Sequence, residues 1–564
     1  MKKIFTIMLF TAIAALYLAP GSLLAQTSSD TLYVSALPPG NINNVITGDT
    51  TATGARKNLH RVYVLQQTGS VDTTYFFTAT INMAATFNGV TLTIIGKDNP
   101  VTGMPPVIEP FILTDNSTPA RFTENLEGSL SLDNLYFLGK RTDGLITAGD
   151  DRLLDGIPVG SSVRINHCVF DDFTAGQGAL ISYGGSGNSF YITNCEFRNI
   201  QSQAGFPTNI IFAEAADTMQ FVNNTFFAIS FGIWGNDNLR YFQFEHNTMV
   251  GCAWMPLRVY QADSAVISNN IFYDTYAWGL DSASIKSGGL GNEPPAVIVF
   301  DSLFQFSEPP YTWTEAGRSI VVENNAYYWQ NGIDSTIAAI NDTAQNYIVA
   351  PTWMNSFTMT MFADKTSWPG LSASNNDSTD PGFSTSIVNP MVAGLNLYTM
   401  ARWNGTISTT PLWRQNITNP ANVFGPVAKD WAQTQGYPVP ENLKYSASLT
   451  GSDGLPLGDL NWFPGVTGVN QTNNSIPAKF ILNQNYPNPF NPTTNIKYSI
   501  TKSGLVTLKI YNVLGQEVAT LVNQDQRPGN YVVDFNASNL ASGVYMYRLE
   551  SGNISLTKKM VLLK

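Results

Sequence analysis

The chain has 564 residues, of which 43% are apolar, 12% aromatic and only 13% charged, and its formal net charge is −11. This length exceeds what one hydrophobic core normally supports, so two or more domains are expected. The presence of only 3 cysteines excludes a fold held together by a framework of disulfides. Low charge with abundant Gly, Asn, Ser and Thr favours a β-rich extracellular protein over a helical cytosolic one.

The first 25 residues read as a secretory signal peptide, and we expect cleavage after Ala25. Lys2 and Lys3 precede an apolar run over residues 4–19, which is the pattern of an export signal. The alternative is a membrane anchor, but the run is short for a membrane span. No later stretch is long and apolar enough to cross a bilayer, so no transmembrane segment is expected in the mature protein.

Residues 26–340 are expected to form a first, repetitive domain. Up to about residue 120, short runs such as "HRVYVLQQTG" and "LTIIGKDN" predict irregular first coils and an N-terminal cap. A weak repeat follows, from "LSLDNLYFLGK" to "IVVENNAYYWQ". Each copy contains strand residues, then a pair drawn mostly from Asn, His and Cys, then an aromatic or apolar residue two positions further on, which we expect to stack inside the fold.

The repeats align into columns, and the first residue of each pair forms a column of Asn and His. Its members are Asn134, His167, Asn194, Asn223, His246, Asn269 and Asn324. The intervals are 33, 27, 29, 23, 23 and 55 residues, the last long enough for a skipped coil or an excursion. Such periods with strand patterning predict a β-solenoid. We expect this column to form an amide ladder, because Asn tolerates the left-handed backbone of a bend and stacked amides bond one another.

The "NNxF" turn resembles that of the right-handed parallel β-helix of pectate-lyase-like proteins. The resemblance implies the handedness of the coils and a role on extracellular polysaccharides. In the ladder column, His167 and His246 are expected to be internal stack members rather than catalysts. Cys168 and Cys195 fall in the next column on adjacent coils, so they form either a disulfide or two buried thiols. Parallel side chains favour two buried thiols over a disulfide.

Enzymes of this class carry a recognisable catalytic constellation. Hydrolases use paired carboxylates, whereas lyases use carboxylates that hold calcium together with an Arg or Lys base. Acidic residues of the repeat build no column, and neither the polygalacturonase motifs nor a lyase signature occurs. Arg258 and Lys286 are the candidate bases, with a solvated surface charge as the alternative. The sequence leaves enzymatic activity open and leans against it; no cofactor is expected, except calcium for a lyase.

Three tryptophans provide candidate carbohydrate-binding residues. Trp234, Trp254 and Trp278 follow their ladder residues by 11, 8 and 9 positions, so they are expected to align on successive coils. An exposed aromatic stripe stacks on sugar rings, whereas the alternative is that these side chains fill the interior or the loops. The sequence thus predicts binding of extracellular polysaccharide. The alternatives are a polysaccharide lyase or glycoside hydrolase, and a purely structural or adhesive surface protein.

Residues 341–475 lose the repeat, which predicts a C-terminal cap and a linker, and residues 476–564 differ from both. Alternating runs such as "VTLKIYNV" predict a small antiparallel Ig-like β-sandwich. Residues 478–564 hold nine Lys/Arg against four Asp/Glu, a net charge of +5, whereas the rest of the chain carries −16. An acidic body argues against nucleic acid as a partner.

The C-terminal segment also resembles a known family. The motifs "YPNPFNPTT", "IYNVLGQEV", "GNYVVDFNASNLASGVYMYRL" and "KKMVLLK" are similar to the sorting domain of proteins exported by the type IX (Por) secretion system. The resemblance implies that the chain crosses the periplasm with the type IX machinery as partner. A sortase-like peptidase would then remove the domain and leave the product on the outer-membrane surface or release it. The alternative is an Ig-like module that stays attached and mediates adhesion. The predicted fold is all-β, a right-handed parallel β-helix solenoid followed by this sandwich.

Overall fold

The computed structural model describes most of residues 30–406, 451–462 and 470–563; the longest stretches left out within these ranges are 276–295, 304–312 and 333–350. The expected signal peptide, Trp278 and Lys286 lie outside the described residues. The chain divides into two compact units, residues 1–451 with 456–462, and residues 452–455 with 463–564. No helix among the described residues is long and apolar enough to span a membrane.

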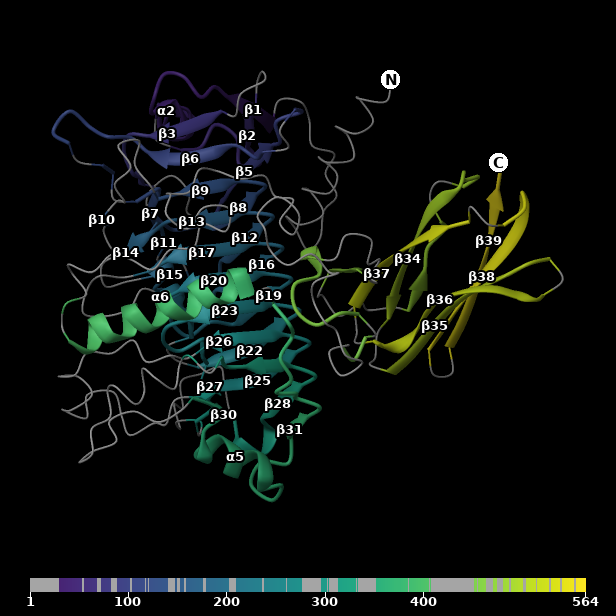
Figure 1. The fold of residues 1–564 in the computed structure, drawn as a ribbon. Coiled ribbons are helices and arrows are strands. Elements are labelled where there is room, and N and C mark those ends of the chain that lie inside the picture. The colour runs from purple at the N-terminus through teal and green to yellow at the C-terminus, as the bar shows by residue number, and fades with distance from the viewer. Residues whose placement is uncertain are drawn as a thin grey trace. The chain divides into compact units, whose positions relative to one another are not determined.

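Three long parallel sheets build most of the described part of the first unit and confirm the predicted solenoid (Figure 1). The 11-stranded first sheet contains β1 (Thr31–Val34), β2 (Val62–Gln66), β5 (Thr91–Lys97), β8 (Ser129–Asp133), β12 (Ser162–Asn166), β16 (Ser189–Thr193), β19 (Thr218–Val222), β22 (Leu239–Glu245), β25 (Ala262–Ser268), β28 (Ser319–Glu323) and β31 (Leu371–Ser374).

The other two long sheets in the described part of this unit have fewer strands, and two small sheets pair β10 (Ala148–Gly149) with β14 (Thr174–Ala175) and β27 (Ala296–Ile298) with β30 (Thr352–Met354). The 9-stranded second sheet contains β3 (Thr74–Phe77), β6 (Val107–Pro110), β9 (Tyr136–Leu138), β13 (Val169–Asp171), β17 (Glu196–Ile200), β20 (Thr225–Ile229), β23 (Thr248–Cys252), β26 (Ile271–Thr275) and β29 (Ala326–Tyr328). The 7-stranded third sheet contains β4 (Ile81–Asn82), β7 (Thr123–Leu126), β11 (Leu154–Gly156), β15 (Ala179–Tyr183), β18 (Asn209–Ala213), β21 (Phe231–Gly235) and β24 (Leu257–Arg258).

From β2 to β24, each coil visits the three long sheets in the same order. In one coil, β12 of the first sheet is followed by β13 of the second and β15 of the third, and the chain then returns to the first sheet as β16. The strands of neighbouring coils pair in parallel and in register, so that Arg164 lies opposite Tyr191. Such strands are about 4.8 Å apart, and each coil is stabilised mainly by its two neighbours.

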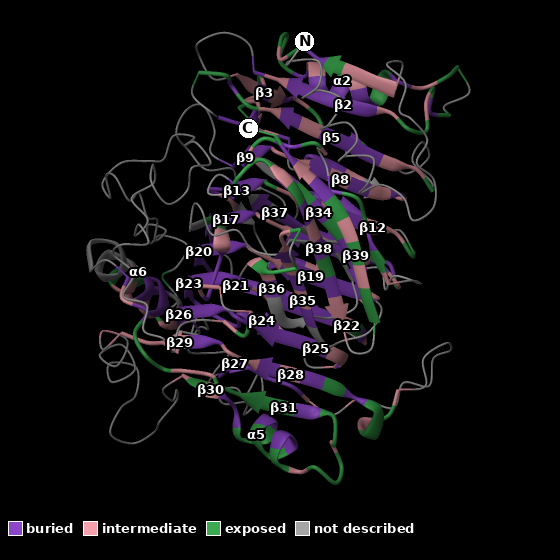
Figure 2. Cartoon of the chain, turned by 90° about the vertical axis from the view of Figure 1, so that its right-hand side faces the viewer, coloured by how far each residue is buried: buried purple, intermediate pink, exposed green. Residues whose placement is uncertain are grey.

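The interior of the solenoid is one apolar core built from the inward-facing residues of all three sheets, and Figure 2 shows how strongly its strands are buried. Along the second sheet, the rings of Phe137, Phe170, Phe197 and Phe226 stack with centroids 5.1, 5.0 and 5.2 Å apart. These residues stand two positions after the second residue of each turn. The expected internal aromatic stack is therefore present.

Helices close both ends of the core (Figure 1). At the N-terminal end, Ile42 and Ile46 of α2 (Asn41–Gly48) are buried in the core, and at the other end Met361 of α5 (Ser356–Ala363) is buried in it. Stacking begins with β1 and continues to β31, so coils extend past residue 340, where the sequence predicted a cap. Beyond β31, α6 (Thr385–Trp403) lies against β23 of the second sheet.

The turn between the first and second sheets explains the sequence repeat. Its first residue adopts a left-handed backbone in every coil that the repeat identified. The φ angles are 60° for Asn134, 50° for His167, 53° for Asn194, 55° for Asn223, 51° for His246, 61° for Asn269 and 54° for Asn324. Asn adopts this conformation more readily than most residues, which accounts for its recurrence in this column.

The buried amide ladder lies one residue later than the column expected from the sequence. Asn224, Asn247, Asn270, Asn325 and Asn376 form a chain in which each Nδ2 donates to the Oδ1 of the next residue, at 2.9, 3.2, 2.8 and 2.9 Å. The reason is alternation along an extended chain, which turns residues two apart to the same side. This second turn residue precedes the inward-facing aromatic by two positions, so it also points inwards. We call it the inner turn column.

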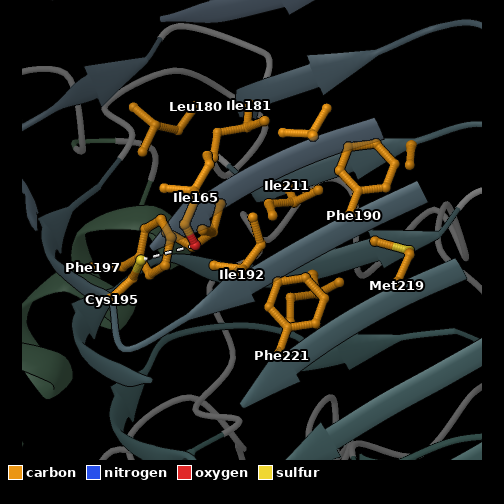
Figure 3. Packing of buried hydrophobic residues seen from close by; sticks show 14 of the residues in the cluster. Ile165, Leu180, Ile181, Phe190, Ile192, Cys195, Phe197, Ile211, Met219 and Phe221 are labelled. Carbon is orange, nitrogen blue, oxygen red and sulfur yellow. Dashed lines mark hydrogen bonds between the residues drawn. The ribbon is translucent and has the colours of Figure 1, made fainter. Parts of the chain in front are cut away.

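Cysteines continue the inner turn column towards the N-terminus. The Cys195 thiol donates to the Ile165 carbonyl at 3.5 Å (Figure 3). The Cys195 N–H donates to Asn224 Oδ1 at 2.9 Å, and the Cys168 N–H donates to Cys195 Sγ at 3.5 Å. Both cysteines are buried and neither forms a disulfide, so of the two alternatives the structure has the buried thiols. The third cysteine, Cys252, is also a buried thiol, and burial raises its pKa.

The second unit is a small β-sandwich with its own core, as predicted. One 4-stranded sheet contains β32 (Asn470–Asn473), β37 (Gly529–Asn536), β34 (Thr493–Ile500) and β33 (Ile481–Leu482). The other contains β36 (Glu517–Gln526), β35 (Gly504–Tyr511), β38 (Gly543–Ser551) and β39 (Ile554–Leu562). All of the pairings in these two sheets are antiparallel.

Candidate functional site

An outward-facing column on the third sheet contains the candidate binding residues. Neighbouring members of this column are paired in register, and they are Asp155, Ser182, Phe212, Trp234 and Arg258. The residues just before them in sequence, Leu154, Ile181, Ile211, Ile233 and Leu257, are all buried in the core. Side chains alternate across a strand, so the first set faces outwards. The sequence prediction contained Trp234 and Arg258 but not their alignment.

Phe212, Trp234 and Arg258 form a continuous, partly exposed surface, which we call the aromatic–arginine column. The Phe212 and Trp234 rings meet edge to face, with centroids 5.3 Å apart. The guanidinium carbon of Arg258 lies over the Trp234 ring, 4.1 Å from its centroid. All three side chains are half-buried, and successive strands place them over a span of about 10 Å. The result is an aromatic surface with a fixed positive charge beside it.

The other end of the outward column is polar and covered. Ser182 and Asp155 are each 3% exposed. The Asp155 carboxylate pairs with Arg121, with Nη1 and Oδ2 3.0 Å apart. This charge is therefore neutralised within the fold. The accessible part of the column is its aromatic–arginine end.

The remaining tryptophans do not extend this surface in the described structure. Trp254 is fully buried and packs on Phe231, with ring centroids 4.9 Å apart, so it is not part of an exposed stripe. It lies in the connection between β23 and β24, whereas Trp234 lies within β21. The two residues follow their turns by 8 and 11 positions, and these offsets do not place them alike. Trp278 and Lys286 cannot be placed, since both lie outside the described residues.

The two histidines of the turn differ in environment. The His167 side chain is 51% exposed and lies 3.6 Å from the Asp133 carboxylate, measured from Nδ1 to Oδ1. His246 is buried, and its Nδ1 lies 3.3 Å from the carbonyl oxygen of Gly458. Both have a left-handed backbone in the turn, and His246 additionally contacts a distant segment of the chain. The part of the chain that the structure describes contains no group of three or more His, Cys, Asp and Glu able to hold a metal ion.

In the second unit, the Pro- and Asn-rich stretch is fixed against the last strand, β39. Phe490 is 2% exposed, its N–H donates to the Val561 carbonyl at 3.0 Å, and its own carbonyl accepts from the Leu563 N–H at 3.0 Å. Asn488 Oδ1 accepts from the Val561 N–H at 2.9 Å. This stretch therefore docks on the C-terminal strand as part of the sandwich and is not a free linker.

A comparison with family models matches this unit, over residues 484–563, to the family described as "Secretion system C-terminal sorting domain". Residues 484–563 are a secretion system C-terminal sorting domain. The sorting domain confirms the resemblance seen in the sequence, and it implies handling by the type IX secretion machinery and export to the cell surface or the extracellular space. Comparisons with curated proteins and with solved structures found no match.

Proposed function

We propose that this is an exported β-helix protein that binds an extracellular polysaccharide through the aromatic–arginine column. The observation that carries the proposal is the alignment of Phe212, Trp234 and Arg258 on three successive strands of one sheet face. Partly exposed aromatic rings stack on the apolar faces of sugars, and a neighbouring guanidinium donates hydrogen bonds to hydroxyl or carboxylate oxygens. Export by the sorting domain brings this surface to where such polymers occur.

The binding test uses the full-length chain and the Trp234→Ala variant with a panel of neutral and uronic-acid polysaccharides, with and without calcium. We expect Trp234→Ala to weaken binding at least about tenfold, which corresponds to ~1.4 kcal/mol. The physical reason is the loss of the central ring, which also supports the position of Arg258. Binding would be measured by affinity electrophoresis or calorimetry.

A matched control comes from another face of the solenoid. Arg164 lies 4.0 Å above the Tyr191 ring on the first sheet, which is a comparable cation–π pair. Tyr191→Ala is expected to leave polysaccharide binding unchanged. If Trp234→Ala binds every polysaccharide as tightly as wild type, the aromatic–arginine column is not the binding site.

The same incubations separate the two alternative functions. New reducing ends or unsaturated products that disappear in Arg258→Ala would identify a hydrolase or a lyase, with Arg258 in its site. Neither binding nor products on any polysaccharide would favour a structural or adhesive surface protein. Binding without products is the outcome that the proposal predicts.

A further inference from the structure

A short segment far along the chain docks on the solenoid turns. Residues 457–462, which we call the strap, lie against the coils that carry Asn194, Asn223, His246 and Asn269. The Gly458 N–H donates to the Asn269 carbonyl at 2.8 Å, and the Gly458 carbonyl lies 3.3 Å from His246 Nδ1. The Asn461 Nδ2 donates to the Asn223 carbonyl at 3.2 Å. The strap thus crosses several coils through specific bonds.

Asp459 is the buried anchor of the strap. Its side chain is 0% exposed, and its Oδ2 lies 2.7 Å from the Thr225 hydroxyl on β20. Its backbone N–H donates to Thr248 Oγ1 on β23 at 2.9 Å. The Asp459 Oδ1 accepts from both the N–H and the Nδ2 of Asn461, at 2.9 and 2.8 Å. A hydroxyl both donates and accepts, so the Thr225 contact can persist when the carboxyl carries a proton.

Gly458 fits the strap closely to the turns. Its φ is +81°, a left-handed conformation that most side chains disfavour. A Cβ at this position would clash with Thr248 Oγ1 and approach Ile271 Cδ1 to 2.9 Å. The close packing at Gly458 and the burial of Asp459 together fix the strap on the solenoid turns.

The charged and titratable groups on the elements beneath the strap include a second carboxylate. The negative charge of Glu196, on β17, disfavours a second negative charge on Asp459. The Oε1 of Glu196 lies 3.6 Å from Arg198 Nη1. Arg198 is shared, because its Nη2 also lies 2.7 Å from Asp171 Oδ2. Tyr136 donates its hydroxyl proton to the same Asp171 oxygen at 2.7 Å. Of the turn residues, His246 is the titratable group that contacts the strap.

We propose that the strap is a latch controlled by the protonation of Asp459, which holds the chain to the solenoid in acid and loosens as the pH approaches neutrality. Burial is the main cause that raises the pKa of Asp459, to about 7, and Glu196 raises it further while Asn461 and Thr225 lower it. When the strap leaves the turns, the exposed carboxyl returns to the ordinary value of 3.8. The docked form therefore binds a proton more tightly than the open form.

The sign of the effect follows from this difference in proton affinity. Raising the pH from about 4 to about 7 removes the proton from the open form first, so the open form gains stability relative to the docked one. Above pH 7 both forms are ionised, and the opening equilibrium levels off. Between pH 5 and pH 7 the opening equilibrium is expected to rise by a few tens of fold.

Hydrogen exchange on the full-length protein tests the latch. Peptides that cover residues 455–462 report opening through the Gly458 and Asp459 amides, after correction for the intrinsic pH dependence of exchange. Wild type should lose protection between pH 5 and pH 7 and level off above. In Asp459→Asn, which has a similar shape without the charge, protection should change by less than about threefold over the same range. Wild-type protection that is equal at pH 5 and pH 7 overturns the proposal.

Three further variants separate the causes. Asp453→Asn is the matched control, because Asp453 accepts from the Leu455 N–H just before the strap and should leave the wild-type pH profile intact. If His246→Asn abolishes the pH dependence while Asp459→Asn keeps it, the histidine is the switch and the proposal fails. Gly458→Ala should expose the strap at every pH while amides of β12 and β16 stay protected. Loss of protection in those coils together with the strap would make the strap part of the core, which also contradicts a latch.

Discussion

Two halves of the inner turn column meet the same structural requirement with different side chains. From Asn224 to Asn376 each position is an amide that bonds the amide of the next coil. On the two preceding coils the position is a cysteine, and Cys195 makes the corresponding contacts with its sulfur. The thiol contact to the Ile165 carbonyl, at 3.5 Å, corresponds to the amide contact from Asn224 Nδ2 to the Ile192 carbonyl, at 2.9 Å.

The two halves differ in the strength and the number of the hydrogen bonds that their side chains form. An amide offers two donors and an accepting oxygen, whereas a thiol is a weak donor and a weak acceptor. Asn247, for example, accepts from both the N–H and the Nδ2 of Asn224, at 3.0 and 2.9 Å. The column therefore shows that stacking fixes the direction of the side chain, and that the turn accommodates either an amide or a thiol at this position.

The largest expected effect comes from breaking the amide half. Asn247→Leu removes the bonds from Asn224 and those that Nδ2 donates to the Phe221 carbonyl and Asn270 Oδ1. Buried donors and acceptors are left without partners, so the free energy of unfolding should fall by about 3 kcal/mol or more. Urea unfolding, followed by tryptophan fluorescence, measures this change. A loss below about 1 kcal/mol would show that the ladder contributes little.

An intermediate effect is expected in the cysteine half. Cys195→Ala removes the sulfur that accepts from the Cys168 N–H and donates to the Ile165 carbonyl, and it leaves a small void. We expect a loss of about 1–2 kcal/mol in the same unfolding measurement. A loss of unfolding free energy as large as that of Asn247→Leu would mean that the thiol and the amide contribute equally, which contradicts the difference between the two halves.

The smallest change in stability is expected when a cysteine of the inner turn column is replaced by the asparagine that occupies the other half. Asn at position 195 would bring an Nδ2 to Asn224 Oδ1, so Cys195→Asn should change the stability by less than about 1 kcal/mol, in the stabilising direction. Cys252→Asn is the matched control: Cys252 lies within β23, and its Sγ donates to the Trp254 carbonyl. That substitution should destabilise by about 2 kcal/mol, because the new amide would be buried outside the inner turn column. Equal effects of the two substitutions would contradict a special role for the column.

Local patterning made the solenoid and its turn predictable from the sequence. Asn and His at left-handed positions, followed by an inward aromatic, repeat at each coil, and that signal is strictly local. The inner turn column could also be predicted from this pattern, because the residue two positions before the inward-facing aromatic points to the same side of the strand. The coil at Asn375 and Asn376 was missed because Ser378, and not an aromatic or apolar residue, stands two positions after the pair.

Contacts between distant segments explain what the sequence did not predict. Trp254 is buried by Phe231 of the preceding coil, and nothing in the spacing of the tryptophans encodes that contact. Phe212 became part of the candidate site only through its register with Trp234. Asp459 and Thr225 are 234 residues apart, and a single sequence carries no local signal for such a pair. The fold was therefore more predictable than the site.

The long reach of the strap imposes an order on folding. Its bonds to Thr248, Thr225, Asn223 and Asn194 join residues separated by 211, 234, 238 and 267 positions in the chain. Closing such large loops before the coils exist would cost entropy without a compensating surface to bind. We therefore expect the strap to dock last, on coils that are already stacked in register. A single slipped coil among them would misplace one of its contacts.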